Sequence, residues 1–158
     1  MSALFSQCQH GEWSKSENLD RFSIQLEPST GGYGQTVVDT YLGDLPELYR
    51  RMLVKGFESN NGWSGQIKLA KYVAPSNGFP YHADQWQKWP GRDWKRMLTS
   101  LTYLNDDYEG GITRFAHGLE IVPERGKTLT FPTAWAFSHQ GDPVTRGTKH
   151  LLVVHIWS

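Results

Sequence analysis

The segment MLTSLTYLNDDYEGGITRFAHGLEIVPERGKTLTF, residues 97–131, consists of four short apolar and β-branched runs separated by turn-forming residues. The separators fall at residues 105–107, 110–111 and 123–126, and they are rich in the turn-favouring residues Asn, Asp, Gly and Pro. No helical pattern lies between the runs. Short strands that follow one another in this way are typical of antiparallel sheets.

The same pattern continues on both sides of this segment. Strands are predicted at residues 66–73, 79–84, 97–104, 112–115, 119–122, 128–131, 135–139 and 148–157. About eight short strands without intervening helices predict a mainly β protein, a double-stranded β-helix or jelly roll, with one or two packing helices.

One helix is expected before these strands. Asp44 suits the N-cap position, Pro46 the first turn and Gly56 the end of this helix. The apolar residues between them recur at helical spacing and would form one stripe against a sheet: Leu45, Leu48, Tyr49, Met52 and Leu53. Residues 22–27 alternate like a short strand.

The length of the chain suits a single domain, residues 1–158. Residues 1–64 would form a helical and irregular support, and residues 65–158 the jelly-roll core. The 16 Lys and Arg residues balance the 16 Asp and Glu residues, so no net charge attracts nucleic acid. No signal-peptide pattern and no apolar run of about 20 residues is present, so a cytoplasmic protein without a membrane segment is expected.

His82 and Asp84 stand two residues apart, and His139 follows in a later predicted strand. Side chains two residues apart on a strand point to the same face, so His82 and Asp84 would lie together. Two imidazoles and one carboxylate form the ligand set of non-haem Fe(II) oxygenases. Each part taken alone has an ordinary alternative, a chance triplet in a surface loop or a hydrogen-bonded structural histidine.

Lys149 opens the last predicted strand, ten residues after His139. It alternates in phase with Leu151, Val153, His155 and Trp157, which is an unusual position for a hydrated ammonium group. A cation there could neutralise the distal carboxylate of a dicarboxylic co-substrate. The alternative is a solvated surface lysine.

Taken in order, these residues resemble a known family. The matching pieces are Tyr72; His82-Ala83-Asp84; Leu101-Thr102-Tyr103-Leu104-Asn105; Gly110-Gly111-Ile112-Thr113-Arg114-Phe115; Pro123, Gly126, Leu129 and Phe131; and His139, Pro143, Val144, Gly147 and Lys149. From about residue 67 to residue 157 the chain resembles the catalytic core of the Fe(II)- and 2-oxoglutarate-dependent dioxygenases, in their prolyl 4-hydroxylase-like branch.

This resemblance implies that His82, Asp84 and His139 are catalytic residues that hold Fe(II). It implies that Lys149 pairs with the C5 carboxylate of 2-oxoglutarate, and that Tyr72 and Tyr103 hydrogen-bond the carboxylates of this co-substrate. For each tyrosine, packing in the core is the alternative.

The resemblance also implies a reaction, in which O2 and 2-oxoglutarate yield succinate and CO2 while an unactivated C–H bond is hydroxylated, with ascorbate as an accessory reductant. A prolyl residue in a peptide or protein is the expected substrate. An oxygenase of a nucleobase, a free amino acid or a small molecule, and a non-enzymatic jelly-roll binding module, remain open, and the oligomeric state is not indicated.

Residues 85–96 contain three tryptophans and four cations, a composition suited to a loop that folds over a substrate. Trp86, Trp89 and Arg92 are its candidate substrate contacts, and an amphipathic cover for the barrel mouth is the alternative. His155 and Trp157 share the predicted face of Lys149 and are further candidates for the cavity wall.

Overall fold

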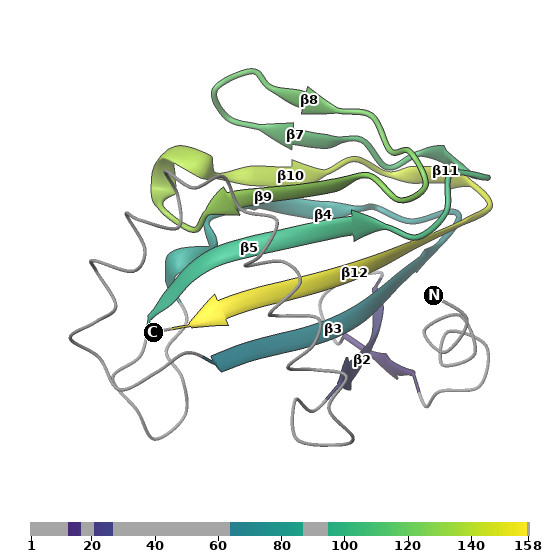
Figure 1. Cartoon of the computed structure of the whole chain (residues 1–158). Coiled ribbons are helices and arrows are strands. Elements are labelled where there is room, and N and C mark those ends of the chain that lie inside the picture. The colour runs from purple at the N-terminus through teal and green to yellow at the C-terminus, as the bar shows by residue number, and fades with distance from the viewer. Residues whose placement is uncertain (1–12, 17–20, 27–63, 87–94, 158) are drawn as a thin grey trace.

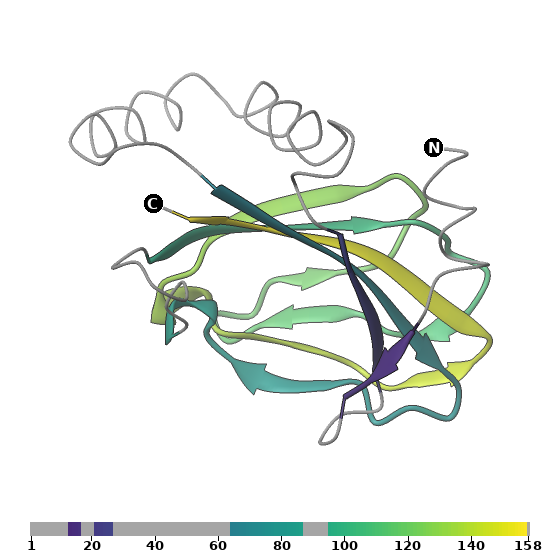
Figure 2. The same cartoon turned by 90° about the horizontal axis from the view of Figure 1, so that it is seen from below.

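The computed structural model describes residues 13–16, 21–26, 64–86 and 95–157. The last strand, β12 (Thr148–Trp157), lies inside the larger of its sheets. All strand pairings in this sheet are antiparallel. In spatial order its strands are β1 (Ser14–Lys15), β2 (Phe22–Leu26), β3 (Ser64–Val73), β12, β5 (Arg96–Tyr103) and β9 (Thr128–Pro132). Figure 1 shows β3, β12 and β5 running side by side, and Figure 2 shows β2 beside β3.

A second antiparallel sheet forms the other layer of the fold (Figure 1). Its strands, in spatial order, are β4 (Phe79–His82), β10 (His139–Gly141), β7 (Thr113–Phe115) and β8 (Glu120–Ile121). A further pair joins β11 (Val144–Arg146) to β6 (Glu109–Gly110), and two 3-10 turns are present, η1 (Asp84–Trp86) and η2 (Trp135–Phe137). These antiparallel layers confirm the predicted mainly β jelly roll.

The inner face of the larger sheet follows from strand alternation. Lys149 pairs with Tyr72 on β3, Leu151 pairs with Tyr103 on β5, and the same register continues along β12. These residues share a face because side chains on a strand alternate with period two. The buried residues of the two core clusters are Ala70, Tyr72, Tyr103, Val144 and Leu151, and Leu101, Phe115 and Phe131. The polar side chains of the site therefore project into the space between the sheets.

Several expected boundaries differ from the structure. The strand predicted at residues 135–139 is wrong except for its last residue, because residues 135–137 form η2. The amide and hydroxyl of Ser138 both donate to the carbonyl of Trp135, and they close this turn. Three short strands, β1, β6 and β11, were not predicted, since each offers too few residues for an alternation to be seen.

The helix expected at residues 44–56 lies outside the described residues. Within the described ranges, no helix has the length and apolar character needed to cross a membrane.

Candidate metal centre and adjoining pocket

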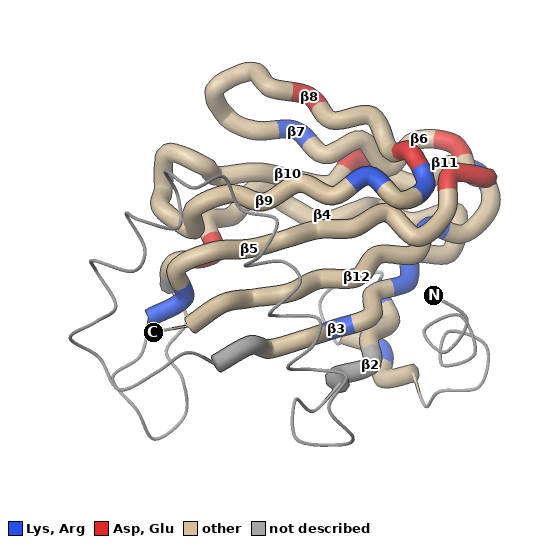
Figure 3. Tube along the Cα trace, viewed as in Figure 1, with Lys and Arg blue, Asp and Glu red and all other residues tan. Residues whose placement is uncertain are grey.

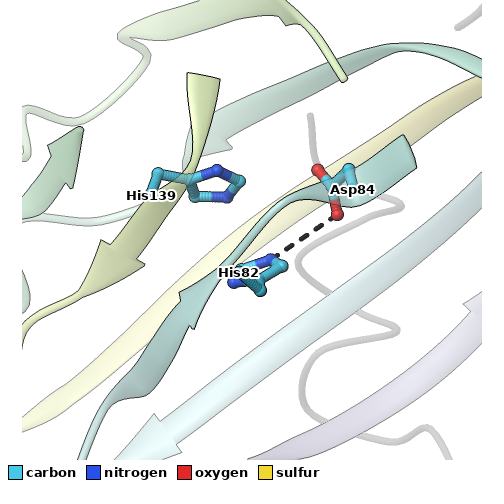
Figure 4. Close-up of side chains that lie close together, drawn as sticks. All are labelled: His82, Asp84 and His139. Carbon is cyan, nitrogen blue, oxygen red and sulfur yellow. Dashed lines mark ion pairs between the residues drawn. The ribbon is translucent and has the colours of Figure 1, made fainter. Parts of the chain in front are cut away.

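Three donor side chains meet at one end of the space between the sheets. His82 ends β4, Asp84 begins η1, and His139 begins β10, where it pairs directly with His82 across the two strands. One potential ligand atom from each residue lies within 4.8 Å of the other two. Figure 4 shows the three side chains turned toward one another, two from one segment and the third from the neighbouring strand.

Asp84 reaches this cluster by a route that differs from the predicted one. The strand ends at His82, so Asp84 belongs to a 3-10 turn and does not share a strand face with that histidine. The turn carries its carboxylate back toward the imidazole, and Oδ1 lies 3.5 Å from Nε2 of His82. The predicted proximity is present, but strand alternation is not its cause.

Both imidazoles are held in one tautomer by backbone carbonyls. Nδ1 of His82 lies 2.9 Å from the carbonyl of Pro80, and Nδ1 of His139 lies 3.1 Å from that of Phe137. A carbonyl oxygen can only accept, so each Nδ1 carries a proton and Nε2 is the ring nitrogen left to bind a metal ion. Hydrogen bonding of the second ring nitrogen is the usual support of a metal-binding histidine.

The ring of His139 is also fixed by packing and kept neutral. It stands edge-on to Phe131, with centroids 4.8 Å apart, and tilts against Phe115 at 5.5 Å. Burial lowers the pKa of His139, and the neighbouring His82 lowers it further. A neutral imidazole is the form that binds a metal ion.

Two side chains of β5 orient the carboxylate. Arg96 donates from Nη1 to Oδ1 of Asp84 at 2.9 Å, and Thr99 donates from Oγ1 to Oδ2 at 2.6 Å. Thr99 also lies 3.0 Å from Nδ1 of the buried His155. Burial alone would raise the pKa of Asp84, but its contact with His82, the hydrogen bond from Thr99 and the charge of Arg96 hold it well below its usual value. The carboxylate is therefore ionised at neutral pH.

Lys149 occupies the opposite part of the same pocket. Its side chain is buried, with 3% of the residue exposed, and its ammonium donates to the carbonyl of Gly111 at 2.5 Å. The rings of Tyr72 and Tyr103 lie 5.9 and 5.3 Å from Nζ. Burial lowers the pKa of Lys149 to about 8, and no carboxylate of the described residues forms a salt bridge with it.

The predicted co-substrate tyrosines lie on either side of this lysine. Tyr72 lines the pocket, whereas Tyr103 is fully buried and donates its hydroxyl to Oγ1 of Thr113 at 2.7 Å. Thr113 lines the pocket and Tyr103 does not, so Tyr103 lies directly behind the pocket wall. Their hydrogen bonds to a co-substrate remain predictions.

The predicted substrate residues are placed differently from one another. His155 lines the pocket. Trp157 is buried under the guanidinium of Arg96, 4.9 Å from ring centroid to Cζ, and is not among the lining residues. Trp86 ends η1, and nothing is described of its side chain, while Trp89 and Arg92 lie outside the described residues.

Sequence reasoning missed several polar side chains of the pocket wall, among them Arg21, Lys68, Arg96, Thr99 and Thr113. Thr99 alternates in phase with Leu101 and Tyr103, so its place on the inner face could have been found. The sequence carries no comparable signal for Arg21, because its approach depends on how β2 pairs with β3.

The donor set fits Fe(II) and an anion. Two imidazole nitrogens and one ionised carboxylate oxygen, supplied from one side, match the ligand set that this ion prefers. The buried ammonium of Lys149, with no anionic partner among the described residues, fits a carboxylate bound deeper in the pocket.

Comparison with known families agrees with this ligand set. A family profile described as the 2OG-Fe(II) oxygenase superfamily matches residues 67–157, which is more than half of the 158 residues. No curated protein matches the chain closely enough to narrow this assignment.

Solved structures with the same fold include three prolyl hydroxylases. The viral collagen prolyl hydroxylase of Paramecium bursaria Chlorella virus-1 in its 2OG complex has 20% identity and a TM-score of 0.68, covering 99% of this chain and 88% of that one. A Pseudomonas putida prolyl-4-hydroxylase has 19% identity and a TM-score of 0.69, with coverages of 98% and 82%. A Trichoplax adhaerens prolyl hydroxylase, in complex with a hypoxia inducible factor oxygen degradation domain peptide fragment, has 17% identity and a TM-score of 0.68, with coverages of 98% and 74%.

Proposed function

This chain belongs to the 2OG-Fe(II) oxygenase superfamily, and we propose that it hydroxylates a prolyl residue in a peptide or protein, using Fe(II) and 2-oxoglutarate. The observation that carries this proposal is the arrangement of one pocket. A set of two histidines and one aspartate lies in it, and a buried ammonium without an anionic partner among the described residues lies deeper in the same cavity.

In this proposal His82, Asp84 and His139 hold the iron. When bound, Fe(II) and 2-oxoglutarate supply the oxidising chemistry, in which O2 is consumed, succinate and CO2 form, and one oxygen atom enters the substrate C–H bond. The backbone contacts of the two imidazoles keep both Nε2 atoms directed at one point, so little reorganisation is needed on binding.

Lys149 would bind the C5 carboxylate of 2-oxoglutarate. Its ammonium is held by Gly111 between two tyrosine rings, so its position is largely fixed before the anion arrives. Pairing with a carboxylate would offset the cost of burying this charge. Leu101, Leu151 and Val153 line the pocket between its polar groups and limit the entry of water.

The prolyl part of the proposal is supported by two similarities. The matched solved structures include prolyl hydroxylases from a virus, a bacterium and an animal, and one of them holds a peptide. In addition, this chain has a lysine ten residues after His139, as in the collagen-type and microbial prolyl hydroxylases it resembles. We also propose that residues 1–158 form one domain, with the catalytic core in residues 65–158.

The experiment that tests this proposal is peptide profiling by mass spectrometry. The full chain is incubated with Fe(II), 2-oxoglutarate, ascorbate and a library of peptides with and without proline. Addition of one oxygen atom to proline, matched by succinate formation and lost in a His139→Ala variant, is the expected result. Oxygen addition confined to other residues would contradict the prolyl assignment and leave the oxygenase assignment intact.

A further inference from the structure

The pocket wall contains more positive charge than the proposed iron and co-substrate require. Its lining includes the cations Arg21, Lys68, Arg96 and Lys149 and the carboxylates of Asp84 and Asp142. Figure 3 shows acidic positions gathered near β6 and β11, whereas β3 carries basic ones. The cations of the wall exceed its carboxylates by two.

Both carboxylates of the wall already have cationic partners. Asp84 is paired with Arg96 at 2.9 Å, and Asp142 accepts from Nε of Arg114 at 2.7 Å. Lys149 is assigned to the co-substrate by the proposed function. Fe(II) and the 2-oxoglutarate dianion carry opposite charges of equal size, so loading the site leaves the excess unchanged. The cations that remain are Arg21 and Lys68.

Lys68 is poorly compensated. It projects from β3 on the inner face, half-buried, and its cross-strand partner on β12 is the apolar Val153. Burial lowers its pKa, and the charges of Arg21 and Arg96 lower it further. No carboxylate of the described residues lies within salt-bridge distance of Lys68.

Arg21 has an unused donor. Its guanidinium carbon lies 4.9 Å from the centroid of the Phe79 ring, and its positive charge acts on the hydroxyl of Tyr72. Its Nε is buried and has no hydrogen-bond partner. A guanidinium that packs on an aromatic ring and keeps a buried N–H without a partner is suited to donate to a carboxylate.

We propose that Arg21 and Lys68 form a second anion site in this pocket, and that this site binds a carboxylate of the substrate. The inference rests on the proposed function, since it names the chemistry of the molecule that this site oxidises. The substrate would be a carboxylate-bearing prolyl compound, in which the anion is the α-carboxylate of proline or the side chain of an adjacent acidic residue.

The position of Lys68 separates this site from that of Lys149. Lys149 pairs with Tyr72, and Lys68 lies four residues before Tyr72 on β3, a span of about 13 Å along the strand. Lys68 is opposite Val153, two residues from His155, which contacts the Thr99 that holds Asp84. The second anion would therefore lie beside the metal ligands rather than at the co-substrate end.

Two matched pairs of probes test the proposal. The first pair is N-acetyl-L-proline and N-acetyl-L-prolinamide, which differ only in the carboxylate. The second is a pair of end-blocked tetrapeptides with glutamate or glutamine before the proline. Binding to the full chain is measured by calorimetry with 2-oxoglutarate and Mn(II), which occupies the metal site without turnover. The acidic member of at least one pair should bind about tenfold tighter than its neutral partner.

Variants identify the residues responsible. Lys68→Gln and Arg21→Gln should each reduce the acid-to-neutral preference to near one, while the affinity for 2-oxoglutarate changes less than twofold. Lys71→Gln is the control, because it removes the same charge from the same strand. The ammonium of Lys71 contacts the rings of Trp13 and Phe22, on the other face of β3. Lys68→Glu should reverse the preference.

Each outcome decides between the two claims. Equal binding of acidic and neutral probes in both pairs, failure of both acidic probes to bind, or a preference that survives Lys68→Gln and Arg21→Gln would overturn the second anion site. A large loss of 2-oxoglutarate affinity in both variants would also overturn it, by assigning the pair to the co-substrate. In a parallel assay with Fe(II) and O2 in place of Mn(II), succinate formation with the neutral probes only would leave the proposed function standing without this site. A preference for binding the acidic probes, without any succinate formation, would support the second anion site and contradict the proposed function.

Discussion

Replacing Lys149 by methionine removes the charge at the deep end of the pocket while keeping a side chain of similar length. The folded protein lowers the pKa of this lysine from 10.5 to about 8 through burial. A shift of that size corresponds to about 3 kcal/mol of cost for keeping the ammonium charged in the cofactor-free protein. Only 3% of the residue is exposed, so solvent screening reduces this figure little.

The Lys149→Met variant should therefore be more stable than the wild type without ligands, and it should bind 2-oxoglutarate much more weakly. Loss of one partner of a buried charge pair costs about 2–5 kcal/mol, so the KM for 2-oxoglutarate should rise at least thirtyfold. The affinity for the metal should change little, since Lys149 contacts none of its ligands. Thermal unfolding, metal titration and succinate production measure the three quantities separately. Lys127→Met, at a surface lysine bonded to the carbonyl of Val122, is the control.

The same pKa gives a dependence on pH with a definite sign. Between about pH 8 and pH 10.5 the unfolded chain holds a proton on Lys149 that the folded chain has lost. Stability of the ligand-free protein should therefore rise with pH across this window, and Lys149→Met should lack the rise. Binding of 2-oxoglutarate requires the protonated form, so its affinity should fall above pH 8. A KM unchanged in the variant, together with a flat pH profile in the wild type, would refute this role of Lys149.

Three further substitutions test the rest of the site. His139→Ala should abolish Fe(II) binding in a metal titration while circular dichroism shows the sheets retained. Thr99→Val removes the 2.6 Å hydrogen bond to Asp84 and should weaken Fe(II) about 10- to 100-fold, with unchanged affinity in that titration contradicting the role. Gly111→Ala places a Cβ 3.0 Å from the Cδ of the buried lysine at a φ of +68°, so it should cost stability and 2-oxoglutarate affinity. Gly118→Ala, at a φ of +93° with nothing within 4 Å, should cost stability alone, which differential scanning fluorimetry and co-substrate titration can separate.

Much of the fold was predictable because the barrel is built from local signals. The alternation of β12 placed Lys149 and His155 on a buried face, and the structure finds both buried. The separators between the central strands were visible as Gly, Pro and Asn. The error at residues 135–137 has a local cause, since a bulky apolar run also suits a 3-10 turn when a serine hydroxyl can close it.

The metal-binding residues of the candidate site could be predicted, but the side chains that hydrogen-bond and orient them could not. His82 and Asp84 were recognised from their spacing, although a turn and not a strand brings them together. Arg96 and Thr99 were not linked to the carboxylate, because residues 12 and 15 positions away become neighbours only when β5 packs beside η1. Arg21 and Lys68 depend on strand pairing across a larger sequence distance still, which no local pattern encodes.

The oxygenase reaction is tested most directly by following 2-oxoglutarate and succinate by NMR in mixtures of the full chain, Fe(II), ascorbate and O2, each with one proline-containing peptide. Conversion to succinate that requires Fe(II) and is lost in the His139→Ala and Asp84→Ala variants is the expected result. Absence of succinate under these conditions with every peptide tested, while the protein remains folded, or equal turnover in both variants, would contradict the assignment of this pocket.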